Sequence, residues 1–160
     1  MKGFIYILIC ILGLTACTKK GTLNREHWTK KMAGTYTVQK VQTQTYSNNT
    51  LVTDDVITGD NTQFVLSKSG GDGDGFPLAI YGTWKPLFLN VSTTEYAWCV
   101  ENDNKRLTLG HFDPSIGFYA DGTLSVDNMK KKIQVWHYIR SGTAGGIDTY
   151  IHQEITHKKE

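Results

Sequence analysis

The sequence has little excess charge of either sign. Among its 160 residues, 17 Lys and Arg nearly balance 15 Asp and Glu, giving a formal net charge of +2. The charges are interspersed, apart from one short run at Lys130–Lys132. Domains that bind nucleic acids carry a basic patch or stripe, so no nucleic-acid partner is expected.

The sequence also lacks a hydrophobic run of the length that crosses a membrane. Its apolar stretch, Phe4–Leu14, has 11 residues, whereas a bilayer core of about 30 Å requires roughly 20. Lys2 supplies a positive charge ahead of this stretch. A short apolar segment with a basic start predicts a cleaved signal peptide and not a permanent membrane helix.

Four residues at the end of this segment, Leu14, Thr15, Ala16 and Cys17, give a leucine, a variable residue, a small residue and a cysteine. This order resembles the lipobox of bacterial lipoproteins. The resemblance implies cleavage before Cys17, diacylglycerol on its sulfur and acylation of the new amino group. Two or three acyl chains anchor a protein stably, unlike one. The alternative is an ordinary secretory signal whose cleavage site precedes a cysteine.

The lipobox resemblance divides the chain into three parts. Residues 1–16 are the expected signal peptide, residues 17–23 a lipidated tether, and residues 24–160 a single domain of ordinary size. Cys17 is followed by Thr18, Lys19 and Lys20 and not by acidic residues. We therefore expect a protein of the bacterial cell envelope, anchored in the outer membrane and facing the periplasm.

Disulfides are excluded by the cysteine count. Cys10 would leave with the signal peptide and Cys17 would carry lipid, so Cys99 has no partner in the mature chain. Cys99 lies in a strand-like run. It is expected to be a small buried hydrophobic residue and not a nucleophile.

One short helix is expected at the start of the domain. Asn24 is a suitable N-cap, and Trp28 and Met32 stand four residues apart on one face. The pattern ends before Gly34.

After this helix the hydrophobic period changes to two. A long strand is predicted at Gly34–Tyr46, and its phase slips near Gln39–Lys40, which indicates a bulge. Further short strands, bounded by turn residues, are predicted at Leu51–Ile57, Gln63–Lys68, Phe76–Trp84, Leu87–Ser92, Glu95–Glu101, Arg106–His111 and Phe118–Val126. Many short strands without a second helix predict an all-β barrel, with a two-sheet β-sandwich as the alternative.

The last two strands, Lys131–Arg140 and Ile147–His157, flank the glycine-rich loop Ser141–Gly146. A pairing that sets Arg140 opposite Asp148 brings opposite charges and aromatic residues into register. This pairing makes one face aliphatic. The other face then carries Trp136, Tyr138, Arg140, Tyr150 and His152.

The short helix, the Gly34-Thr35-Tyr36 start of a long strand and the following meander resemble the lipocalin-like lipoproteins. Tyr36 stands where that family's Gly-x-Trp motif has tryptophan. The resemblance implies a single up-and-down barrel of about eight strands preceded by one short helix. The mouth of such a barrel can take a small apolar ligand.

Two interpretations of the last hairpin remain open. If the aromatic face is interior, Trp136, Tyr138, Arg140, Tyr150 and His152 line a pocket in which Arg140 meets a ligand carboxylate bidentately. If the aliphatic face is interior, these residues form a surface patch, and Arg140–Asp148 is an exposed ion pair of little energetic value. His137, on the aliphatic face, would then be a hydrogen-bonded core residue.

Other candidate chemistry is sparse. The Gly70–Gly75 segment offers two carboxylates but lacks the third acid and terminal glutamate of a calcium loop, so a hairpin loop is expected. His111 with Asp113, and His152 with Glu154, would each give two metal ligands without a third. His157 is expected in a solvated tail. We therefore predict no metal site, no cofactor and no catalytic residue.

Together these features predict a membrane-anchored, lipocalin-like lipoprotein that binds a small apolar or amphipathic ligand in its barrel. The alternative is a protein-interaction or inhibitor lipoprotein that uses an exposed aromatic surface. Neither interpretation includes enzymatic activity. The sequence does not predict an oligomeric state.

Overall fold

The computed structural model describes residues 25–70, 75–89, 93, 95–100, 106–128, 131–144 and 146–160. The expected signal peptide, the lipid site at Cys17, the tether and the N-cap at Asn24 lie outside these residues, as do residues 71–74 of the predicted Gly70–Gly75 loop. Within the described ranges, no helix has the length and apolar character needed to cross a bilayer.

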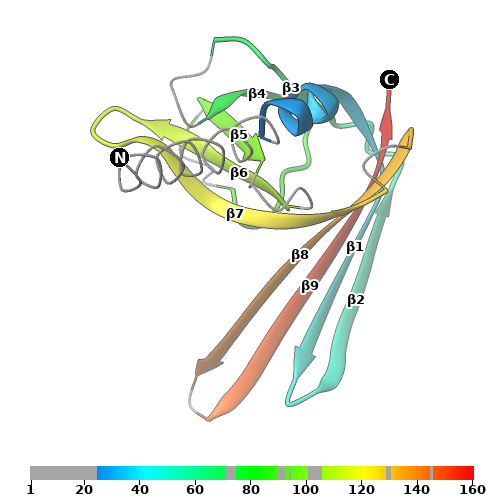
Figure 1. Cartoon of the computed structure of the whole chain (residues 1–160). Helices are drawn as coiled ribbons and strands as arrows, with labels where there is room; N and C mark the ends of the chain where they lie inside the picture. Colours follow the sequence, from blue (N-terminus) through cyan, green and yellow to red (C-terminus); the bar gives the residue numbers. More distant parts are fainter. Residues whose placement is uncertain are drawn as a thin grey trace, which may run out of the picture.

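The described residues form antiparallel strands that close into a barrel (Figure 1). The strands are β1 (Gly34–Ser47), β2 (Thr50–Thr58), β3 (Gln63–Leu66), β4 (Phe76–Tyr81), β5 (Tyr96–Val100), β6 (Arg106–Asp113), β7 (Gly117–Asp127), β8 (Ile133–Ala144) and β9 (Ile147–Lys159). The sheet order is β2-β1-β3-β4-β5-β6-β7-β8-β9, and β1 also pairs with β9. Eight strands therefore form the closed barrel, with β2 as an additional strand. The predicted all-β, lipocalin-like barrel is confirmed, and the β-sandwich alternative is wrong.

The helix at residues 25–32 packs against the barrel where β1 begins and β9 ends. Met32 is fully buried and Trp28 packs against the core, as the spacing predicted. The Tyr36 hydroxyl donates a hydrogen bond of 2.7 Å to the Met32 carbonyl oxygen. Lys159 Nζ donates to the carbonyl oxygen of Lys31 at 2.5 Å. These bonds attach the helix to both terminal strands.

Strand β1 is long because it serves two parts of the molecule. Its first residues pair with β3, and its second half, from Lys40 onward, pairs with β2. The pairing with β9 shifts between Val38 and Lys40, which places a bulge at Gln39. Because of this bulge, Val38 and Val41 are both buried although they are three residues apart. The predicted bulge is confirmed.

Large side chains fill the barrel near the helix. The largest fully buried ones include Trp98, Trp136, Tyr36, Phe64 and Met32. Leucines from β6 and β7 pack into the same cluster. The interior at this level is a packed core.

Beyond this core, β8, β9, β1 and β2 run side by side away from the rest of the barrel (Figure 1). Strand β7 pairs with β8 only at Val135–His137, and β3 pairs with β1 only at Gly34–Thr37. We call the continuing four-stranded sheet the extension: residues 40–47, β2, residues 138–144 and residues 147–153. All nine residues of β2 are exposed. The extension therefore has two open edges.

Several predicted strand limits are wrong. Residues 87–89 lie in a turn and not in the predicted strand Leu87–Ser92, of which residues 90–92 lie outside the described ranges. Strand β4 ends at Tyr81, before Trp84. Cys99 on β5 is half-buried and not fully buried. Trp84 and Phe88 nevertheless pack against the core from this connection.

Candidate ligand site at the barrel mouth

The predicted pairing of the last hairpin is wrong by three residues. Arg140 pairs with Ile151, and Asp148 pairs with Thr143. The glycine-rich segment that was expected to be a loop continues as strand, with Gly142 opposite Thr149. Because side chains alternate between faces, an odd shift moves one strand's set of side chains across the sheet.

The shift separates the five candidate ligand residues. Trp136, Tyr138 and Arg140 lie along the inner face of β8, opposite Ile155, Gln153 and Ile151 respectively. On β9 the buried residues are Gln153, Ile155 and His157, so Tyr150 and His152 project from the other face. The inner face is therefore aromatic on β8 and mixed on β9, which neither interpretation of the hairpin predicted.

The three residues on β8 pass from the core to the solvent. Trp136 is fully buried, Tyr138 is half-buried and Arg140 is exposed. We call the level of Tyr138 and Arg140 the mouth, since these residues begin the extension next to the packed core.

At the core end, Trp136 belongs to an aromatic cluster. Its ring centroid lies 3.9 Å from that of His157, 5.1 Å from Tyr36 and 6.0 Å from Phe64. The Trp136 indole Nε1 donates to the Gln134 side-chain oxygen at 3.2 Å. Burial raises the pKa of the Tyr36 hydroxyl well above its usual range, so this residue stays neutral.

His157 lies inside this cluster and not in a solvated tail as predicted. Its side chain is fully buried, and neither ring nitrogen has a hydrogen-bond partner. Burial lowers the pKa of His157 to about 3, because a charged imidazolium cannot be solvated among aromatic rings. The residue is therefore a neutral, unpaired imidazole at neutral pH.

At the mouth, Phe88 covers Tyr138, with ring centroids 4.4 Å apart. A Cβ at Gly122 would lie 2.5 Å from the Phe88 ring, so this glycine makes room for it. Gln153 is buried opposite Tyr138 and donates through Nε2 to the Thr43 hydroxyl at 3.0 Å. Its side-chain oxygen has no hydrogen-bond partner.

Arg140 completes the mouth. No ion pair or hydrogen bond joins its guanidinium to another described residue, and Asp148 lies on the opposite face at the Thr143 position. The group keeps its donors available for an oxygen-bearing ligand.

Tyr150 and His152 take part in contacts on the outer face. The Tyr150 ring packs edge-on against Tyr46, with centroids 5.5 Å apart. His152 stacks on His137 at 5.4 Å, and their facing nitrogens are 3.2 Å apart. The other nitrogen of His137 lies 3.2 Å from Asp127 Oδ2. His137 is therefore hydrogen-bonded, as predicted, but on the outer face.

The sequence offers two pairs of candidate metal ligands, His111 with Asp113 and His152 with Glu154. His111 Nδ1 lies 3.0 Å from Asp121 Oδ2. Across the described ranges, no group of three or more His, Cys, Asp or Glu side chains is placed to hold a metal ion.

Sequence reasoning missed Phe88 and Gln153. Phe88 comes from a segment predicted as strand, and no local pattern shows that it folds over β8. Gln153 was assigned to the aliphatic face by the incorrect register. A register in which the strands continue through Ser141–Ala144 to a tight turn places Gln153 opposite Tyr138, on the inner face.

A comparison with solved structures finds a likeness of fold. The S-type phycobiliprotein lyase CPES from Guillardia theta matches with a TM-score of 0.37 and 11% identity, over 89% of this chain and 96% of that chain. No family model matches the sequence. No curated protein matches it either.

This comparison corrects one expectation. The chain was expected to have no enzymatic activity, and the matched protein is named as a lyase. The exclusion of enzymatic activity is therefore withdrawn. A likeness of this degree assigns no reaction and no ligand to the present chain.

Proposed function

We propose that this protein is a lipid-anchored barrel protein of the bacterial cell envelope. It binds a small amphipathic ligand with a carboxylate at the barrel mouth. The observation that carries the proposal is the path along β8 from buried Trp136 through half-buried Tyr138 to exposed Arg140. Such a gradient suits a ligand with an apolar body and a charged head.

The packed core limits how deep the ligand lies. Trp136 and His157 fill the barrel next to the mouth, so a long chain cannot enter fully. A ligand can replace the contact between Phe88 and Tyr138, because both rings are only half-buried. The ligand's apolar part would take the place of Phe88 against Tyr138.

Polar groups at the mouth orient the ligand. The Arg140 guanidinium offers two parallel N–H donors to a carboxylate. The unpaired side-chain oxygen of Gln153 accepts a hydrogen bond from a hydroxyl or amide group on the ligand. A buried acceptor without a partner favours a ligand that supplies one.

A fluorescent fatty acid tests the site. We expect its emission to rise on binding, and Arg140→Gln to weaken the affinity about fivefold, ~1 kcal/mol, because an exposed charge pair contributes little more. Lys158→Gln is the matched control, since it removes a positive charge from an exposed position on β9 away from the mouth. Equal affinities of the two variants, or no emission change with the intact protein, would contradict the proposal.

Anchoring rests on the sequence. The Leu14-Thr15-Ala16-Cys17 segment supports lipidation at Cys17, and the tether to the helix is short. Lys19 and Lys20 after the cysteine support an outer-membrane location facing the periplasm.

A second candidate function is interaction with another envelope protein. It is favoured by the extension, which carries seven of the twelve exposed large hydrophobic residues of the described chain. These are Leu51, Val52, Val56, Ile57, Ile139, Ile147 and Tyr150. Apolar side chains gathered on one exposed element mark interaction surfaces. This alternative predicts no fatty-acid signal from the intact protein.

A further inference from the structure

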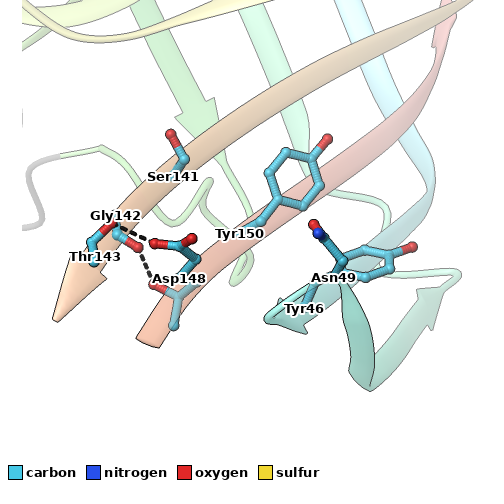
Figure 2. A pocket seen from close by; sticks show the side chains of 8 residues that line it. Tyr46, Asn49, Ser141, Gly142, Thr143, Asp148 and Tyr150 are labelled. Carbon is cyan, nitrogen blue, oxygen red and sulfur yellow. Dashed lines mark hydrogen bonds between the residues drawn. The ribbon is translucent and has the colours of Figure 1, made fainter. Parts of the chain in front are cut away.

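The tip of the extension contains a cavity separate from the barrel mouth. It lies where the β1–β2 and β8–β9 hairpins end side by side (Figure 2). The Asp148 amide donates to Asn48 Oδ1 at 3.1 Å, and the Asn48 amide donates to the Asp148 carbonyl oxygen at 2.9 Å. These bonds join the hairpins across 100 residues of sequence. The cavity is therefore held in shape by both hairpins.

The cavity has a volume of about 560 Å³, within the range of about 300–1,000 Å³ typical of small-ligand pockets. The side chains that carry its chemistry are Tyr46, Asn49, Ser141, Thr143, Asp148 and Tyr150. None of the described lining residues is basic, so the cavity offers no counter-charge to an anionic ligand. None is aliphatic, so a hydrocarbon chain gains little by entering.

The aromatic wall is formed by two tyrosines. The rings of Tyr46 and Tyr150 meet edge-on, and Tyr150 is 37% exposed. The Tyr46 hydroxyl donates to Gln44 Oε1 at 3.2 Å, which fixes the orientation of its ring. Tyrosine provides a large, rigid surface with few rotatable bonds to immobilise. Such a surface suits the flat C–H face of a sugar ring.

Hydrogen-bonding groups line the rest of the cavity. The Thr143 hydroxyl donates to Asp148 Oδ1 at 2.7 Å, which holds the carboxylate and leaves its second oxygen for a ligand. Asn49 adds an amide, and Ser141 adds a hydroxyl group (Figure 2). A carboxylate and an amide can each bond to neighbouring hydroxyls of one sugar, because both groups present two polar atoms.

We propose that this cavity binds a neutral saccharide of one or two sugar units, with a ring face on Tyr150 and hydroxyls on Asp148 and Asn49. The site is independent of the mouth. Tyr150 and Asp148 lie on the outer face of the extension, whereas Arg140 lies on the inner face. The sequence pattern had grouped Tyr150 with the mouth residues, and the register assigns it to the cavity instead.

The test is saturation-transfer NMR on the full chain in a detergent without a sugar headgroup. The probes are maltotriose, mannotriose, galactotriose and chitotriose at millimolar concentration. We expect transfer to the ring protons of at least one probe. Tyr150→Ala and Asp148→Asn should each weaken the binding of that sugar about tenfold. The first variant removes an aromatic ring, and the second removes a charged hydrogen bond.

Matched controls are Tyr119→Ala, which removes an exposed tyrosine on β7, and Asp55→Asn, which neutralises an exposed carboxylate on β2. Both should bind the sugar as the wild type does. Arg140→Gln should also bind it normally, which separates this site from the mouth. Absence of transfer to all four probes would overturn the proposal. The proposal would also be overturned if Tyr119→Ala weakened sugar binding as much as Tyr150→Ala does. Displacement of the sugar by choline at the same affinity would overturn it as well.

Discussion

At the scale of single residues, His157 is the buried side chain of the described residues with the most unpaired polar atoms. Its imidazole lies among Trp136, Tyr36 and Phe64, and both nitrogens lack partners. A buried polar atom without a partner lowers stability by about 1–3 kcal/mol. The fold tolerates this because the ring fills space in the aromatic cluster as a neutral group.

This burial makes stability depend on pH. The pKa of His157 falls from about 6.5 in the unfolded chain to about 3 in the folded one. Its contribution to stability is therefore full above pH 6.5 and is lost as pH falls below it. Between these two pKa values only the unfolded state takes up the proton. The free energy of unfolding therefore falls by up to ~1.4 kcal/mol for each pH unit of acidification. We expect His157→Leu to remove this part of the decline between about pH 6 and about pH 4 in urea unfolding.

His27→Gln is the matched control, since His27 is an exposed histidine on the helix. It should keep the wild-type decline with pH. An unchanged slope in His157→Leu would show that the buried imidazole is not the group responsible.

At the scale of elements, the extension is the part of the fold with the least support. Its outer strands are paired on one side only, and all of β2 is exposed. Unpaired edges are usually protected by charge or by short length. Here Asp54 and Asp55 stand in the middle of β2 and oppose the pairing of a second copy along that edge.

Asn48 continues the joining of the two hairpins of the extension past the end of the β1–β9 pairing. It has a positive φ of 46°, and its side chain accepts the bond from Asp148. We expect Asn48→Ala to lower the local stability of the extension by about 1 kcal/mol. Alanine is strained at this φ, and it cannot accept the hydrogen bond from Asp148. Amide hydrogen exchange should then speed up in β2 and in residues 138–153, while the core strands keep their protection.

Asn128→Ala provides the comparison. Asn128 has a similar φ of 61° in the connection between β7 and β8. Its replacement should accelerate exchange near that turn and leave the extension unchanged. Equal acceleration throughout the chain after Asn48→Ala would show that the extension and the barrel open together.

At the scale of the whole molecule, the barrel closes by pairing its first and last strands. Strand β1 pairs with β9 from Tyr36–Lys159 to Ser47–Thr149. This pairing joins the first and last strands, and closing so long a loop is slow in folding. It also places the helix at residues 25–32 beside the end of β9, through the bond between Lys31 and Lys159.

The proposed anchor, Cys17, precedes this helix in the sequence. If Cys17 is lipidated, the protein sediments with membranes after cell fractionation, and Cys17→Ser releases it into the soluble fraction. Two or three acyl chains hold a protein stably, whereas the tether alone does not. Cys99→Ser is the control, because Cys99 lies within β5. Membrane retention of Cys17→Ser would contradict lipidation at this residue.

The sequence by itself determined the local features of this protein. The period of two and the turn residues fixed most of the strands, and the phase slip at Gln39 located the bulge. Trp28 and Met32 identified the buried face of the helix. The absence of a disulfide from the mature chain stays a prediction, because it depends on cleavage before Cys17 and on lipid at its sulfur.

Only the tertiary structure decided the register of the last hairpin and the location of His157. A pairing can be shifted without changing local propensity, so cross-strand matches of charge and aromatic residues favoured an incorrect register. The closure of β9 on β1 sets which of its faces is buried. Tyr150 and His152 therefore lie outside the barrel, and Trp136, Tyr138 and Gln153 lie within it. These contacts join residues more than 100 positions apart, which no local pattern records.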